Sequence, residues 1–196
     1  MLELGCGGGQ ASIALAKQGA KVITVDPSEA RLEQVRAACE REEVKVETHR
    51  GDLADIAFVR QDTIDVVVSI YALATVPDLD RVFRQVHRVL KPERNLVFSV
   101  PHPAFGLVDH QGNDPLTISR SYFDREPRPW QTNDTAGHDF PRTISELFTS
   151  LSRANFRVDT LLEPEAQSDG VHSKYFNVAM HWMPATLVIR ARKEGL

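Results

Sequence analysis

Short apolar runs alternate with stretches of helical spacing along most of the chain. Lys21–Val25, Ile64–Ile70 and Asn95–Val100 are almost continuously apolar, which is typical of strands covered on both faces of a parallel sheet. The other expected strands are a short one around Leu2 and Leu4, then Val44–Thr48, Phe156–Leu162 and Ala185–Ala191. Because strands and helices alternate, the pattern predicts an α/β fold.

Helical signals fill the gaps between these strands. A helix-forming run covers Gln10–Gln18, and Ser28 caps a second helix. A third helix follows Pro77 and ends at Lys91-Pro92, because proline cannot continue it. Its core-facing positions are Leu79, Val82, Phe83, Val86, Val89 and Leu90. A capping box at Thr143–Glu146 opens a fourth helix.

A glycine-rich loop separates the first strand from the first helix. Its residues of interest are Glu3, Gly5, Cys6, Gly7 and Gly9, in an E-x-G-x-G-x-G pattern. A strand, a tight turn and a helix in this order bring backbone N–H groups up to a ligand. The dinucleotide fingerprint G-x-G-x-x-G needs glycine where this chain has Gln10, which disfavours a nicotinamide cofactor. The loop resembles motif I of class I S-adenosylmethionine-dependent methyltransferases.

This resemblance implies a fold and a cofactor. The fold is a Rossmann-like three-layer sandwich with a seven-stranded, mostly parallel sheet whose seventh strand is antiparallel. The cofactor is S-adenosylmethionine and the product S-adenosylhomocysteine. S-adenosylmethionine carries no phosphate, so the loop would approach the ribose and the methionine part, and Glu3 would receive the ammonium or a cationic neighbour.

Residues that follow the strands extend the resemblance. Asp26 and Pro27 come after the second strand, where the family holds both ribose hydroxyls with an acidic residue. Asp52 matches the family's acceptor for the adenine amino group, and Leu53 matches the apolar residue that packs on the ring. The carboxyl end of the fourth strand faces the ligand crevice in open sheets and adds Ser69, Ile70 and Tyr71.

Methyl transfer from a sulfonium is a single in-line displacement, so it depends mainly on alignment and the exclusion of water. A hydroxyl or protonated amine also needs a general base, and His102, after the fifth strand, is the best-placed histidine. His138 and His172 are weaker candidates. Tyr71 either lines the methyl site or packs in the core. Ligand spacing typical of a metal site is absent from the sequence, so no metal is expected.

The stretch from about 101 to 141 lacks strong periodicity and is expected to be a substrate-side insertion. Three pairs resemble a subgroup of small-molecule methyltransferases: His102-Pro103, Tyr122-Phe123 and Arg142-Thr143. Pro141 stands where that subgroup has histidine, so no role is transferred to it. Residues 1–196 are expected to form one domain, without the N-terminal segment that usually helps to close the family's pocket.

Composition and charge limit the classes of binding partner that are expected. The 23 basic and 27 acidic residues give a net charge of -4, which disfavours a protein that neutralises nucleic-acid phosphates. The sequence has no apolar run of membrane-spanning length and no recognisable signal peptide. Its two cysteines suit a reducing cytoplasm. We expect a cytoplasmic monomer or homodimer that acts on a small molecule, without nucleic acid or membrane as partner.

The resemblance therefore implies methyl transfer from S-adenosylmethionine to a small-molecule acceptor, with oxygen or nitrogen favoured. Two alternatives stay open. The chain could bind S-adenosylmethionine without transferring its methyl group. Less favoured, because of Gln10, is a nicotinamide-dependent oxidoreductase.

Overall fold

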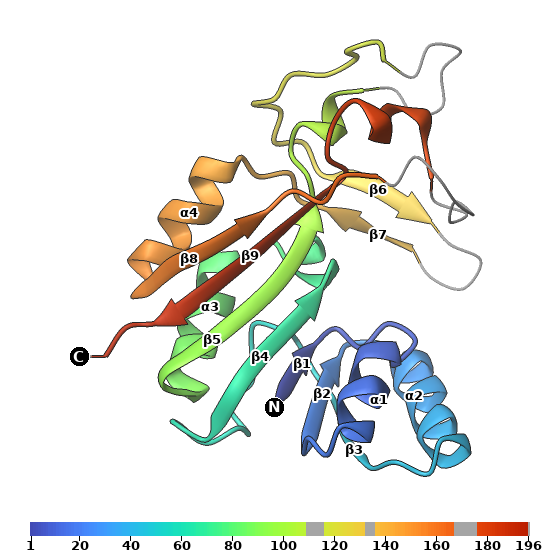
Figure 1. Cartoon of the computed structure of the whole chain (residues 1–196), viewed down its shortest axis with the longest axis vertical. Coiled ribbons are helices and arrows are strands. Elements are labelled where there is room, and N and C mark those ends of the chain that lie inside the picture. The colour runs from blue at the N-terminus through green and yellow to red at the C-terminus, as the bar shows by residue number, and fades with distance from the viewer. Residues whose placement is uncertain (109–115, 132–135, 167–175, 196) are drawn as a thin grey trace.

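A seven-stranded sheet organises the molecule (Figure 1). The computed structural model describes residues 1–108, 116–131, 136–166 and 176–195. The strands of the sheet are β1 (Leu2–Leu4), β2 (Val22–Asp26), β3 (Val46–Arg50), β4 (Ile64–Ile70), β5 (Leu90–Pro101), β8 (Phe156–Leu162) and β9 (Thr186–Lys193). Their order is β3-β2-β1-β4-β5-β9-β8, and β9 runs antiparallel to both neighbours. The predicted mostly parallel sheet with an antiparallel last strand is confirmed.

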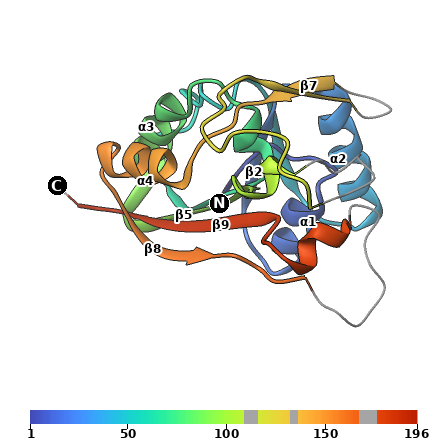
Figure 2. The same cartoon turned by 90° about the horizontal axis from the view of Figure 1, so that it is seen from above.

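Helices pack on the sheet to form three layers. They are α1 (Gln10–Lys17), α2 (Glu29–Arg41), α3 (Leu79–Val89) and α4 (Ile144–Arg153). The strand order runs one way from β1 to β2 and β3 and the other way from β4 to β5, so right-handed crossovers place α1 and α2 on the face opposite α3. Figure 2 shows α3 and α4 together on one side of the sheet. The α/β three-layer prediction is thereby confirmed.

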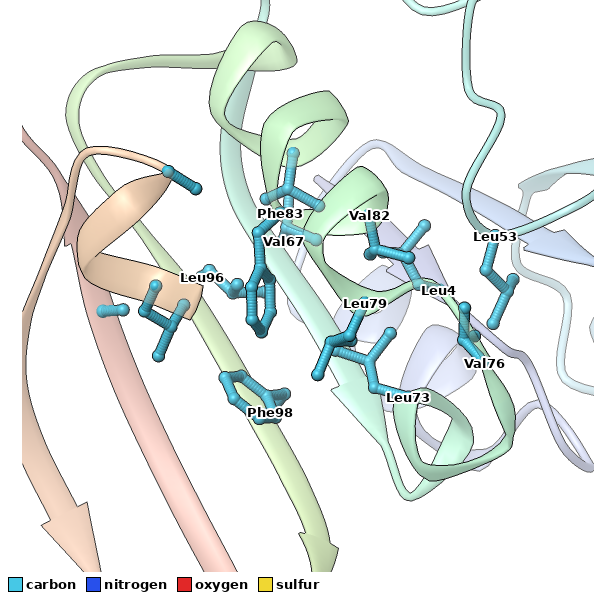
Figure 3. Packing of buried hydrophobic residues seen from close by; sticks show 14 of the residues in the cluster. Leu4, Leu53, Val67, Leu73, Val76, Leu79, Val82, Phe83, Leu96 and Phe98 are labelled. Carbon is cyan, nitrogen blue, oxygen red and sulfur yellow. The ribbon is translucent and has the colours of Figure 1, made fainter. Parts of the chain in front are cut away.

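The main hydrophobic core lies between α3 and the middle strands (Figure 3). Phe83 of α3 packs against Phe98 of β5, with ring centroids 5.7 Å apart. All six apolar positions predicted for the third helix are buried: Leu79, Val82, Phe83, Val86, Val89 and Leu90. Burial of one face thus holds α3 on the sheet and fixes the connection between β4 and α3, which carries part of the site.

Two strands begin two or more residues away from their predicted starts. β3 begins at Val46 rather than Val44, and β5 begins at Leu90 rather than Asn95. The β4–β5 register passes from Ile64 opposite Leu90 to Val66 opposite Asn95, so residues 91–94 are looped out of the ladder. Pro92 lies in this bulge, where its missing N–H costs no ladder hydrogen bond.

Two further strands were not predicted: β6 (Arg128–Gln131) and β7 (Ala136–Asp139). They pair antiparallel, with Arg128 opposite Asp139, and lie beyond the carboxyl ends of β4 and β5 (Figure 1). The N–H of Phe140 donates to the carbonyl of Ala74 at 2.8 Å, which ties the end of β7 to the 3-10 turn η1 (Ala72–Thr75). Strands this short, one of them containing Pro129, give too little alternation for a sequence prediction.

Candidate active site

A groove of about 1240 Å³ lies at the carboxyl ends of the parallel strands, the position at which open α/β sheets bind ligands. Its walls come from the glycine loop, from the residues that follow β2, β3 and β4, and from β7. Of the predicted site residues, it is lined by Gly5, Gly7, Asp26, Pro27, Asp52, Leu53, Ile70 and Tyr71. Those outside its lining are Glu3, Cys6, Gly9, Ser69 and His102.

The glycines of the loop have different structural roles. Gly5 and Gly9 have φ of +82° and +83°, in the left-handed region. A Cβ on Gly5 would lie 2.1 Å from the Cβ of Ala72, and one on Gly9 would lie 3.0 Å from Val35. A Cβ on Gly7 would meet nothing within 4 Å. Gly5 and Gly9 therefore allow close packing against η1 and α2, whereas Gly7 leaves its backbone accessible from the groove.

Glu3 and Ser69 support the loop from behind. The buried carboxylate of Glu3 accepts hydrogen bonds from the hydroxyls of Ser12 and Thr24, the latter at 3.4 Å. Burial raises the pKa of Glu3, while these hydroxyls lower it by smaller amounts. Ser69 donates its hydroxyl hydrogen to the carbonyl of Leu4 at 2.7 Å. Both side chains thus fix β1 relative to its neighbours.

Asp26 connects the loop to β2. Its Oδ2 accepts the N–H of Cys6 at 3.1 Å and the Cys6 thiol at 3.5 Å, while Oδ1 accepts the N–H of Ser28 at 2.9 Å. Arg31 Nη1 lies 3.9 Å from Oδ2. Burial, with a further contribution from Asp26, raises the pKa of the Cys6 thiol to about 12, so the thiol keeps its proton. Since a carboxylate has about four lone-pair sites, Oδ1 retains one acceptor site beyond these contacts.

The opposite wall combines an acidic turn with a strained tyrosine. Asp52 Oδ1 accepts the N–H of Ala54 at 2.8 Å in an Asx turn, next to the buried Leu53. Tyr71 has φ of +60° and is 44% exposed, so it lines the groove instead of packing in the core. Its N–H donates to the carbonyl of Ser99 at 3.0 Å, and its hydroxyl forms a hydrogen bond with that of Thr186.

A smaller cavity of about 80 Å³ adjoins the groove. Pro101, Asp139 and Phe140 line both spaces, so they form the wall between them. His102 and Arg128 line the smaller cavity only. The site thus has a large groove at the glycine loop and a small adjoining cavity under β6 and β7.

His102 has both ring nitrogens engaged. Nδ1 accepts the N–H of Ala104 at 3.1 Å, which assigns the ring proton to Nε2, and Nε2 donates to Glu163 Oε1 at 2.8 Å. The side chain is 5% exposed. His138 lines the groove, and His172 lies outside the described residues.

Asp139 is a further site residue, which the sequence did not predict. It ends β7 and lines both the groove and the smaller cavity. Burial raises the pKa of its carboxyl, and Trp130 and Arg128 lower it by smaller amounts. A carboxyl in such a position can take a proton from a bound group. No motif surrounds Asp139, so only the pairing of β6 with β7 reveals its place.

The described residues contain no group of three His, Cys, Asp or Glu side chains placed to hold a metal ion. No helix in the same part of the chain is long and apolar enough to cross a membrane.

Comparisons with known proteins agree with this geometry. A family model described as a methyltransferase domain matches residues 1–93. An uncharacterized methyltransferase of Bacillus subtilis, YbaJ, is 32% identical over 133 residues, which are 66% of this chain and 52% of the relative. The ubiquinone biosynthesis O-methyltransferase of Hahella chejuensis is 35% identical over 99 residues, which are 50% of this chain and 42% of the relative. The chain therefore spans about half the length of these curated relatives.

A solved structure matches almost the whole chain. A Listeria monocytogenes protein assigned as an S-adenosylmethionine-dependent methyltransferase superimposes with a TM-score of 0.81 at 27% identity, covering 99% of this chain and 89% of its own. The chain belongs to the class I S-adenosylmethionine-dependent methyltransferases. S-adenosylmethionine is the cofactor of this family.

The groove of this methyltransferase chain has the chemistry that S-adenosylmethionine requires. The backbone at Gly7 is open to a ligand, and Asp26 and Asp52 offer anionic acceptors for hydroxyl and amino hydrogens. Leu53 supplies an apolar surface for a flat ring. The volume of about 1240 Å³ leaves room for the cofactor together with part of an acceptor.

Proposed function

We propose that this chain transfers the methyl group of S-adenosylmethionine to an oxygen or nitrogen atom of a small-molecule acceptor. One observation supports the proposal most directly. The glycine loop, which is hydrogen-bonded to Asp26, lines a large groove, and a second, smaller cavity adjoins that groove. A cofactor space and an adjoining acceptor space are what a two-substrate displacement needs, because alignment supplies much of the rate.

The groove residues divide among the parts of the cofactor. Asp26 would accept hydrogen bonds from the ribose through Oδ1, and through Oδ2 once the Cys6 thiol turns away. Asp52 would accept from the adenine amino group while Leu53 packs against the ring. Ile70 and Tyr71 would cover the side toward the acceptor. Glu3 would act through the position of β1, since its carboxylate is committed to Ser12 and Thr24.

S-adenosylmethionine supplies an electrophilic methyl group when bound. The chain has to orient the acceptor, exclude water and take up the proton that the nucleophile loses. We assign that proton to Asp139, which lines both spaces and whose pKa is raised by burial. His102 is less suitable, because accepting a proton at Nδ1 would break its hydrogen bond with Ala104. The reaction would take place in the cytoplasm, in a monomer or homodimer.

Cofactor binding tests this proposal most directly. In a calorimetric titration we expect S-adenosylmethionine and S-adenosylhomocysteine to bind and NAD to give no response. Asp52→Asn keeps an oxygen for the Asx turn but presents an amide N–H₂ to the adenine amino group. Losing one charged hydrogen bond costs on the order of 1.5 to 3 kcal/mol, so affinity should fall by roughly tenfold or more.

Asp55→Asn is a matched control, because Asp55 lies three residues away, outside the residues that line the groove. Its affinity for the cofactor should equal that of the unmodified chain. Absence of S-adenosylmethionine binding would refute the proposal. Binding without S-adenosylhomocysteine release across a panel of hydroxyl and amine acceptors would favour a binding protein that lacks transfer activity.

A further inference from the structure

Arg128 is a partly buried cation that forms no ion pair with the described residues. Its buried Nε lacks a hydrogen-bond partner among these residues. The guanidinium packs over Gly106, where an added Cβ would lie 2.0 Å from Nη1. Burial lowers the pKa of Arg128 and the neighbouring Arg120 lowers it further, while Asp124 and Asp139 raise it by smaller amounts. A cation in this position gains from any anion that enters the cavity.

The pairing of β6 with β7 makes this lack of an ion pair informative. Arg128 lies directly opposite Asp139, and side chains in such pairs are close enough to interact. The two groups nevertheless do not come within ion-pair distance; instead Arg128 reaches toward Gly106. Each group is thus available to a ligand: Asp139 at the wall shared with the groove, and Arg128 in the smaller cavity.

A hydroxyl and apolar walls complete the smaller cavity. Tyr122 accepts the N–H of Ile144 at 3.3 Å, so its own hydroxyl hydrogen can be donated to a ligand. Leu79, Val100 and Leu147 supply apolar surface. A volume of about 80 Å³ accommodates roughly five atoms of water size, enough for the carboxylate end of a molecule whose remaining atoms extend toward the groove.

We propose that the smaller cavity binds a carboxylate of the methyl acceptor, and that Arg128 determines this specificity. The inference rests on the proposed function, because the cavity shares its wall with the cofactor groove. A planar guanidinium matches a carboxylate through two parallel hydrogen bonds. The negative charge of Asp139, directly opposite Arg128, favours a monoanion over a doubly charged phosphate. The acceptor is therefore a small carboxylic acid whose hydroxyl or amine lies on the side of Asp139.

Benzoate and its neutral isostere benzamide test the site without knowledge of the natural acceptor. Both are titrated into the full chain saturated with S-adenosylhomocysteine, and into the chain alone. We expect benzoate to bind at least tenfold more tightly than benzamide and more weakly as salt is added. In Arg128→Gln, benzoate should lose at least tenfold in affinity, whereas benzamide should be unchanged. Arg125→Gln is the control, since Arg125 is exposed and paired with Glu146.

The outcomes separate this proposal from the one it rests on. Failure of S-adenosylhomocysteine to bind would overturn the cofactor assignment, and that result is independent of the benzoate titration. Equal affinity for benzoate and benzamide, no benzoate binding, or an Arg128→Gln variant with full benzoate affinity would each overturn the carboxylate site. If Arg128→Gln does not fold, Arg128→Lys and the benzoate preference of the unmodified chain decide the question. Arg128→Lys keeps the charge but loses the planar fork, so intermediate affinity is expected.

Discussion

Replacing Gly5 by alanine should destabilise the fold more than the same change at Gly19. Both glycines have left-handed φ, +82° and +87°. An alanine there costs roughly 1 to 2 kcal/mol in backbone strain. At Gly19 the new Cβ would meet nothing within 4 Å, whereas at Gly5 it would lie 2.1 Å from the Cβ of Ala72. Overpacking of this kind adds about 1 to 3 kcal/mol. Gly5→Ala should therefore cost about 2 to 5 kcal/mol in all.

Urea and thermal unfolding measure the difference. For a chain of this size 1 kcal/mol corresponds to roughly 2 to 4 °C in Tm, so Gly5→Ala should melt roughly 2 to 12 °C below Gly19→Ala. Combining Gly5→Ala with Ala72→Gly removes the clash and should recover that difference when compared with Ala72→Gly alone. Equal stability of the two alanine variants, or no recovery in the double variant, would refute the packing argument.

Two further predictions concern titrating groups. Because burial raises the folded-state pKa of Glu3 above its ordinary value of 4.5, the stability from this group is complete below about pH 4.5 and is lost as pH rises through the folded pKa. Glu3→Gln should thus gain in stability relative to the unmodified chain between pH 4 and pH 8 in urea unfolding; a difference independent of pH would contradict this. For methyl transfer, S-adenosylhomocysteine formation should fall as pH drops through the raised pKa of Asp139. Asp139→Asn should slow the reaction by roughly 10²-fold or more and remove that limb, while His102→Gln should keep it. The reverse pattern would restore His102 as the base.

The residues of the cofactor groove could be predicted from the sequence because they lie at fixed positions within strand–turn–helix units. Asp26 ends a buried strand and lies next to a helix cap, and Gly5 to Gly9 form a turn between a strand and a helix. Local spacing then fixes position in space, because each crossover brings the next strand end to the same edge of the sheet. The spacing of these residues could not predict which way each side chain points. Glu3 and Ser69 lie near groove residues in the sequence, but their side chains form hydrogen bonds with Ser12 and with the Leu4 carbonyl behind the loop.

The residues of the smaller cavity could not be predicted from the sequence in the same way. Asp139 and Arg128 approach the cavity only because two four-residue strands pair with each other. His102 was correctly placed at the end of β5, but its ring partners are a backbone N–H two residues away and Glu163, which follows β8. Such partners come from distant elements, so a single sequence holds no periodic signal for them.

Arg142 shows why the wall between the two spaces is invisible in the sequence. Its guanidinium donates to the carbonyls of Phe140, at 3.1 Å, and of Pro77, at 3.0 Å, and so fixes the end of β7 against the chain before α3. A planar guanidinium imposes directions on its acceptors, which sets the spacing of these two segments. Its partners are backbone carbonyls, which every residue supplies. The distance between the cofactor groove and the smaller cavity therefore depends on the Arg142 side chain and on backbone carbonyls. Because any amino acid can supply a backbone carbonyl, the sequence does not indicate which ones Arg142 contacts.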